Sequence, residues 1–163
     1  MPPAMSARIR PLLALLPLLL AGCTRERDAA PPMPVTAVAL EPVRVWKSPT
    51  CGCCSMWVAH MRREGFTVEV VDTPDMTPVK ARYGVPAGLG SCHTARVGRY
   101  TLEGHVPARE VKRLLAERPA LAGLAVPGMP VGSPGMEVPG QPAQPYTVVA
   151  FGPNGTGAFA SYR

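Results

Sequence analysis

Aromatic side chains are scarce in this sequence, and its positive charge is spread thinly. Aromatic residues make up 6% of the 163 residues. The 17 Lys and Arg residues outnumber the 11 Asp and Glu residues, for a formal net charge of +6, but they are scattered along the chain. A nucleic-acid site usually needs clustered basic residues and aromatic rings on which bases stack. The composition therefore argues against nucleic-acid binding, and we interpret the basic residues as a solvated surface.

The chain also lacks the length for two ordinary domains, and its N-terminal apolar run is short. Its 163 residues allow one hydrophobic core with appendages. The run Leu12–Leu20 is shorter than the roughly 20 residues of a membrane-spanning helix. It follows Arg8 and Arg10 and precedes small residues, a pattern typical of a secretory signal peptide. We predict this signal peptide over residues 1–22.

The end of that segment, Leu20-Ala21-Gly22-Cys23, is similar to the bacterial lipobox. This resemblance implies that Cys23 is the lipidated first residue of a mature protein on the periplasmic side of a bacterial membrane. The residue directly after Cys23 is Thr24 rather than Asp. In this respect the chain resembles lipoproteins that are sorted to the outer membrane. A plain cleavable signal peptide and an uncleaved anchor are the alternatives. Residues 23–41 are then the lipidated cysteine and a flexible tether, because Ala, Pro and charged residues occur there without an apolar period.

Three thiols lie within four residues, in Cys51-Gly52-Cys53-Cys54. Cys51 and Cys54 have the C-x-x-C spacing of a thioredoxin-type redox motif. They lie at the start of a predicted helix, where free N–H groups favour thiolate over thiol. Cys53 changes the interpretation, because a vicinal pair makes a strained disulfide whereas three clustered thiolates suit a soft metal ion. We expect a metal or redox site; an inert structural cluster is the alternative.

The hydrophobic pattern predicts an α/β fold. Strands are expected over 43–46 and 66–71, and a helix with an apolar stripe from Cys54 to Met61 lies between them. This order gives a parallel β-α-β unit. A short helix over 76–83, a hairpin over 94–102 and a helix over 107–117 should follow.

With the cysteine motif at the first strand–helix junction, this order resembles the thioredoxin and glutaredoxin fold, which we expect over residues 42–119. Thioredoxins carry a proline just before the hairpin, facing the redox cysteines, where this chain has Ser91-Cys92-His93. The resemblance implies that a fourth thiol and an imidazole lie opposite the cysteine turn. Disulfides persist in an exported protein. With Cys23 set aside, the four remaining cysteines allow three pairings, which the sequence leaves open.

Beyond Pro119 the composition changes to Gly, Pro and Met. The segments around Met129 and Met136 cannot form a helix, and their turns suit wrapping over a surface. Residues 146–162 read as a hairpin with an Asn154-Gly155 turn, which should extend the sheet and pin this loop beneath it. Residues 120–163 are therefore expected to pack on the same domain as a Met/Gly/Pro-rich loop and a β-hairpin extension.

Several of these strings together resemble the bacterial CopG copper-resistance family, a periplasmic family long described as of unknown function. They are residues 47–54, Ser91-Cys92-His93-Thr94, Glu103-Gly104-His105-Val106-Pro107, and residues 123–130 and 132–137. The resemblance extends from about residue 43 to residue 162. It implies a thioredoxin-like domain that binds copper through cysteine sulfur and accompanying His or Met ligands.

The candidate metal ligands are sulfur and imidazole side chains: Cys51, Cys53, Cys54, Cys92, His93, His105, Met129 and Met136. His93 adjoins Cys92, with a surface-loop histidine as its alternative, and His105 could equally cap a helix or play another structural role. His60 is better explained by a polar helix face. Met usually fills apolar gaps, but its thioether is also a soft ligand.

These observations predict an exported, lipid-anchored protein of metal resistance that holds copper in the cysteine cluster. Soft sulfur ligands favour Cu(I), although thiolates also bind zinc well. Copper ions and other periplasmic copper-handling proteins are the expected partners. The alternative is a periplasmic thiol–disulfide oxidoreductase with Cys51 and Cys54 as catalytic residues, and a combined role in changing the oxidation state of copper or thiols is also open. A structural lipoprotein with two disulfides is the third hypothesis.

Overall fold

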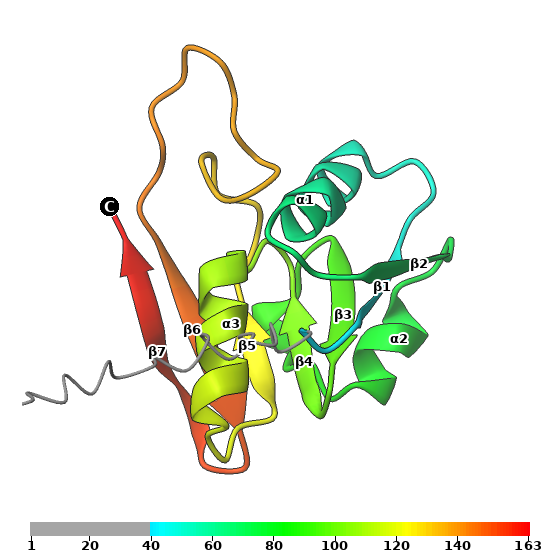
Figure 1. Ribbon diagram of the computed structural model, residues 1–163, viewed down its shortest axis with the longest axis vertical. Helices are drawn as coiled ribbons and strands as arrows, with labels where there is room; N and C mark the ends of the chain where they lie inside the picture. The colour runs from blue at the N-terminus through cyan, green and yellow to red at the C-terminus, as the bar shows by residue number, and fades with distance from the viewer. Residues whose placement is uncertain (1–39) are drawn as a thin grey trace, which may run out of the picture. The chain divides into compact units, whose positions relative to one another are not determined.

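One seven-stranded sheet organises residues 40–163, the part of the chain that the computed structural model describes (Figure 1). Its order is β2-β1-β3-β4-β5-β6-β7, and the strands are β1 (Val43–Lys47), β2 (Val68–Asp72), β3 (His93–Val97), β4 (Tyr100–Glu103), β5 (Gly123–Ala125), β6 (Tyr146–Gly152) and β7 (Gly155–Tyr162). The helices are α1 (Gly52–Arg63), α2 (Thr77–Arg82), α3 (Ala108–Glu117) and the short 3-10 helix η1 (Ala87–Leu89). The predicted α/β class is confirmed.

Over this range of residues, no helix has the length and apolarity to cross a membrane. The signal peptide and Cys23 lie outside the described residues and stay predictions.

The first β-α-β unit forms where the hydrophobic pattern predicts it. β1 and β2 pair in parallel over their full length, and the apolar stripe of α1 is buried. Gly65 ends the helix region with a φ of 93°, a left-handed conformation that glycine adopts at little cost. The second strand begins two residues later than the sequence suggests, because the Phe66 amide donates to the Met61 carbonyl of α1 at 3.1 Å.

The middle of the sheet contains one strand that the sequence did not predict. β3 pairs antiparallel with β4, as expected for the hairpin. β3 also pairs antiparallel with β1 on its other side, and β5 pairs in parallel with β4. All three residues of β5 are buried, and three residues are too few to display an alternating pattern. Gly123 is required there, because a Cβ atom would lie 2.0 Å from the Thr101 carbonyl oxygen.

The two faces of the sheet differ in chemistry. Val45, Ala95 and Leu102 belong to the apolar core, together with buried residues of α1 and α3. Because side chains alternate along a strand, Thr94 and Glu103 point to the opposite face. There Lys80 of α2 contacts both of them. The sheet therefore has an apolar face under α1 and α3 and a polar patch under α2.

The C-terminal hairpin extends the sheet as predicted, with β6 on β5 and β7 on β6. The stacked rings of Tyr146 and Tyr162 have centroids 4.6 Å apart, and the Tyr162 hydroxyl donates to buried Glu110 of α3 at 2.8 Å. The Arg113 guanidinium lies 3.8 Å from the centroid of the Phe159 ring. The interpretation of the basic residues as a solvated surface is therefore incomplete for Arg113, which helps to dock the hairpin.

Candidate metal centre

The cysteine turn connects β1 to α1. The Cys51 amide donates to the Ser48 carbonyl at 3.1 Å, which closes the turn. Cys51 is the N-cap of α1, and its Sγ accepts a hydrogen bond from the Cys54 amide at 3.3 Å. Cys53 and Cys54 occupy the first turn of the helix. The structure therefore places all three sulfur atoms at a helix N-terminus, where N–H groups stabilise a cysteine thiolate when the sulfur is free.

One disulfide forms among the four described cysteines. Cys51 and Cys54 are bonded, with Cα atoms 5.4 Å apart, a usual separation for a disulfide. Cys53 and Cys92 are free thiols, and Cys53 Sγ lies 3.6 Å from Cys51 Sγ. A structural lipoprotein with two disulfides would need a Cys53–Cys92 bond, which these residues do not form.

The second half of the site comes from adjacent ends of two strands. Cys92 precedes β3 and His105 follows β4, and these strands are antiparallel neighbours. Cys92 Sγ lies 3.0 Å from His105 Nε2 and 3.4 Å from His93 Nδ1. His105 Nδ1 lies 2.8 Å from the Pro134 carbonyl oxygen. Since a carbonyl only accepts, Nδ1 carries the proton, and the lone pair of the neutral ring is on Nε2. The free nitrogen of His105 thus faces the sulfur of Cys92.

The two halves meet at Cys92. The sulfur atoms of Cys51, Cys53, Cys54 and Cys92, here called the four-sulfur group, all lie within 4.8 Å of one another. The donor atoms of Cys92, His93 and His105, here called the Cys92–histidine group, meet the same limit. Because Cys92 belongs to both groups, sulfur and nitrogen donors form one continuous site. Such a donor set suits a soft or borderline metal ion.

His93 is enclosed rather than exposed in a loop. It is 0% exposed, and its ring centroid lies 4.5 Å from that of Trp57 and 5.0 Å from that of His105. Its Nε2 is buried without a hydrogen-bond partner. Burial, helped by nearby His105 and Lys80, holds the pKa of His93 well below its ordinary value. The surface-loop alternative is therefore wrong, and the ring is neutral at pH 7.

Burial also sets the protonation of the other members of the Cys92–histidine group. It raises the pKa of the Cys92 thiol to about 12, with a further contribution from neighbouring Cys53. It lowers the pKa of His105, although the hydrogen bond to Pro134 opposes this shift. At neutral pH the group therefore holds a thiol and neutral imidazoles. A metal ion that binds Cys92 as thiolate must displace the proton.

The Met-rich loop between β5 and β6 returns to this site and passes beside α1 (Figure 1). Ser91 Oγ donates to the Gly128 carbonyl next to the start of β3. At Gly135 the loop packs so closely on α1 that a Cβ atom would lie 2.7 Å from the Trp57 amide nitrogen and 2.9 Å from the Cys53 carbonyl oxygen. The loop is thus attached on both sides of the centre, at the Cys92 end and at the cysteine turn.

These attachments place the two methionines differently. Met129 follows Gly128 and is 52% exposed, so it does not fill an apolar gap. Met136 follows Gly135 and is half-buried, in the part of the loop that contacts the first turn of α1. A ligand role for either thioether stays a prediction.

Two contributors to the site were not among the predicted residues. Ser91 ties the loop to the strand end, and its hydroxyl lies 4.0 Å from Cys92 Sγ. Glu103 is fully buried and accepts a hydrogen bond from the Ser91 amide at 2.6 Å. Both belong to the strings that carry the family resemblance, directly before Cys92 and two positions before His105. Their position next to predicted ligands was the signal in the sequence that could have identified them.

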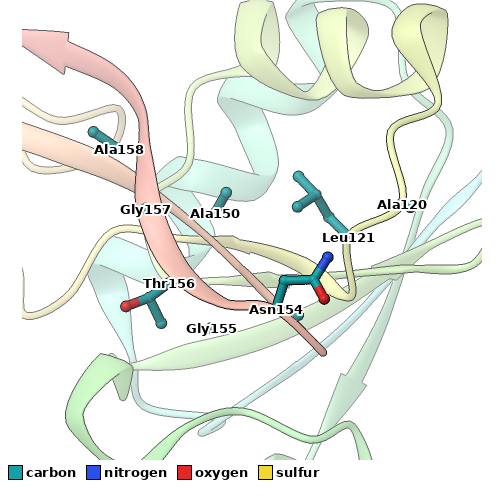
Figure 2. A pocket seen from close by; sticks show the side chains of 9 residues that line it. Ala120, Leu121, Ala150, Asn154, Gly155, Thr156, Gly157 and Ala158 are labelled. Carbon is teal, nitrogen blue, oxygen red and sulfur yellow. The ribbon is translucent and has the colours of Figure 1, made fainter.

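His60 and a surface hollow are separate from the centre. The Nε2 of His60 accepts a hydrogen bond from the Ala108 amide at 3.1 Å, so this histidine stabilises the start of α3. Figure 2 shows a hollow beside the turn between β6 and β7, lined by Ala120, Leu121, Ala150, Gly152, Asn154, Gly155, Thr156, Gly157 and Ala158. None of these lining residues is a cysteine, histidine or carboxylate, so the hollow offers no acid–base group or strong metal ligand.

Comparison with known proteins identifies the family. A family model described as a protein of unknown function, DUF411, matches residues 89–136. Two solved structures of a copper resistance protein, copG, are similar to 76% of this chain. Form 2 is 43% identical with a TM-score of 0.72 over 99% of its chain, and form 1 is 44% identical with a TM-score of 0.70 over 98% of its chain. No curated protein matches. At this identity and coverage, the chain belongs to the CopG copper-resistance family.

Proposed function

We propose that this protein contributes to copper resistance by binding copper, as Cu(I), in the candidate metal centre. The observation that carries the proposal is the convergence of four sulfur atoms within 4.8 Å, with two imidazoles grouped around one of them. Thiolate sulfur favours Cu(I) among the common metal ions, although zinc also binds such sites. The 43–44% identity to a copper resistance protein supports the choice of copper.

The reduced protein is the proposed binding form. Thiolates are ligands, so Cys51 and Cys54 can supply theirs only after their disulfide is reduced. Cys53 and Cys92 are already free. His105 presents Nε2 to the site, and His93 is the second imidazole. Met129 and Met136 are proposed as additional thioether ligands from the loop.

A competition titration tests the proposal. The full chain, reduced and kept under anaerobic conditions, is titrated with Cu(I) against a chelator of known affinity, and with Zn(II) in parallel. Cu(I) should be retained tightly, and the count of reactive thiols should fall as copper is added. Retention of Zn(II) in preference to Cu(I), or no protection of thiols by copper, would contradict it.

A thiol–disulfide oxidoreductase is the second candidate, and the Cys51–Cys54 disulfide at the start of α1 favours it. In this function the Cys51–Cys54 disulfide accepts two electrons from a donor dithiol, which becomes a disulfide. The resulting Cys51 and Cys54 thiols then reduce a substrate disulfide to a dithiol and return to the disulfide form. The parallel and antiparallel pairing of β2-β1-β3-β4 supports a thioredoxin-like domain over residues 42–119, and a combined action on copper and thiols is compatible with the same residues. If Cys53→Ser and Cys92→Ser both keep full copper while Cys51→Ser abolishes disulfide reduction, the oxidoreductase replaces the copper-binding proposal.

We also propose that the protein is anchored by lipid at Cys23 on the periplasmic side of the outer membrane. The lipobox-like sequence at residues 20–23 supports the lipid anchor, and Thr24 after the cysteine supports the outer membrane. Cys23→Ser should move the protein from the membrane fraction to the soluble fraction, or leave it unprocessed, without changing copper binding. A processed, unlipidated variant that still fractionates with membranes would exclude the lipid anchor.

A further inference from the structure

We propose that Glu103 is a positioning residue of the metal centre, which holds Cys92 in place through the backbone of Ser91. The inference rests on the proposed metal-binding function of that centre. Glu103 is the last residue of β4 and is 0% exposed. A carboxylate is seldom buried unless its neighbours form hydrogen bonds or an ion pair with it. The partners of Glu103 therefore indicate its role.

The Glu103 carboxylate has a donor for each oxygen. Oε1 accepts hydrogen bonds from the Ser91 amide at 2.6 Å and from the Lys80 ammonium. Oε2 accepts from the Thr94 hydroxyl at 2.7 Å. The Lys80 Nζ also lies 3.3 Å from Thr94 Oγ1. The carboxylate thus joins α2, β3 and the segment that leads into Cys92.

The backbone that carries Glu103 is fixed on both sides. β4 lies between β3 and β5 in the sheet. The Glu103 carbonyl accepts from the Val126 amide, and the following Gly104 amide donates to the His93 carbonyl, both at 2.9 Å. Ser91, by contrast, precedes β3 and belongs to no helix or strand. The carboxylate therefore anchors an irregular segment to the centre of the sheet.

A purely stabilising role explains this arrangement poorly. A buried ion pair is often no more stabilising than apolar residues of the same volume, because both charges must be desolvated. Positioning, however, matters one residue further on. There Cys92 Sγ must stay 3.0 Å from His105 Nε2 and within 4.8 Å of the other three sulfur atoms of the four-sulfur group. Ligand positions in a functional site are effective only within about 0.5 Å. Loss of the Ser91 anchor should therefore disturb the centre while the fold persists.

Two matched double variants separate the Ser91 contact from the ion pair. Lys80→Met with Glu103→Gln removes both charges but keeps an oxygen that can accept the Ser91 N–H bond. Lys80→Met with Glu103→Leu removes the charges and the acceptor together. Glu103→Asp is a third variant, which keeps the negative charge for Lys80 but shortens its reach to Ser91. Glu110→Gln is the control, because Glu110 is a second buried carboxylate, held by Arg113 and Tyr162 away from the centre.

The metal-free readout is the alkylation rate of Cys92 in the folded full chain, resolved by peptide mass spectrometry. The rate should rise several-fold in the Leu double variant and in Glu103→Asp, and should stay near the wild-type value in the Gln double variant and in Glu110→Gln. Cu(I) affinity should fall by about 10–100-fold in the Leu double variant, the range typical for loss of a residue that orients a ligand. The Gln double variant should recover most of that loss.

Equal alkylation rates in the Leu and Gln double variants would overturn the proposal, whether both match the wild type or both exceed it. If the Leu double variant fails to fold, Glu103→Asp decides, and a wild-type alkylation rate in that variant overturns it as well. Failure of wild-type protein to bind Cu(I) would instead refute the proposed function, and the alkylation rates would still report whether Glu103 positions Cys92.

Discussion

The two donor groups of the metal centre are built in opposite ways. Three members of the four-sulfur group are nearly consecutive, at the cap and first turn of one helix, where Cys51 and Cys53 are half-buried. The Cys92–histidine group is assembled by the pairing of β3 with β4, and both histidines are fully buried. The first group can gain or lose a disulfide within a single turn, whereas the second keeps its geometry through the sheet. The centre therefore combines a redox-variable half with a fixed half.

The largest expected effect comes from the residue that both groups share. Cys92→Ser removes the one sulfur atom that both groups share. Cu(I) affinity should therefore fall by more than the roughly 10–100-fold that follows loss of a residue that only orients a ligand. Chelator competition on the reduced full chain measures the change. Ser161→Ala, which removes a hydroxyl from β7 and no proposed ligand, is the control. Full copper retention by Cys92→Ser would separate the two groups and assign the metal to the cysteine turn alone.

The same contrast explains how far the sequence could predict the centre. The cysteine turn, α1 and the first β-α-β unit follow from local spacing and apolar periodicity, so they were predicted closely. The proximity of Cys92 to the turn was expected only through a resemblance to a known fold. The burial of His93 against Trp57 and the anchoring of Ser91 by Glu103 depend on strand pairing between distant segments. Local patterns do not encode such contacts, and β5 is too short to produce a pattern at all.

The second prediction concerns the redox-variable half. With the Cys51–Cys54 disulfide intact, the four-sulfur group has two thiols left, and the Cys92–histidine group is unchanged. The oxidised protein should therefore bind Cu(I) more weakly than the reduced protein, but measurably, and with His105 still required. Parallel titrations of oxidised and reduced protein, each with and without His105→Ala, measure this difference. Equal affinities in both redox states would show that Cys51 and Cys54 are not ligands.

The third prediction concerns the fixed half and the stability of the metal-free protein. The pKa of His93 is held well below its ordinary value by burial. Below about pH 6.5, the ordinary histidine pKa, the unfolded chain gains a proton that folded His93 does not, so stability should fall as the pH is lowered through this range. The slope from one such histidine is at most about 1.4 kcal/mol per pH unit. Above pH 7, His93 is neutral in both the folded and the unfolded protein, so its burial causes no loss of stability there.

Urea unfolding of the metal-free protein between pH 5 and pH 7.5 measures that slope. His60 and His105 also have lowered pKa values, so the total slope includes them. His93→Phe keeps a ring against Trp57 without a titrating group and should flatten the profile more than His60→Gln does. An unchanged profile in His93→Phe would mean that His93 binds a proton as readily in the folded protein as in the unfolded chain, contrary to its enclosed position.

The smallest expected effects concern the two methionines, which lie at opposite attachments of the loop. Met136 follows the glycine that packs on the first turn of α1, and Met129 follows the carbonyl bound by Ser91 and is 52% exposed. Met→Leu removes a thioether while nearly keeping volume, so each variant should lose less than about 1.5 kcal/mol of stability.

If both methionines are ligands, Cu(I) affinity falls in normally folded protein. We expect the larger decrease for Met136→Leu, because Met136 is half-buried and directly follows the glycine that packs on the first turn of α1, whereas Met129 is mostly exposed. Chelator competition with a melt of the metal-free protein separates ligand loss from unfolding. Unchanged affinity in the double variant would remove both thioethers from the centre and leave the cysteines and histidines as its ligands.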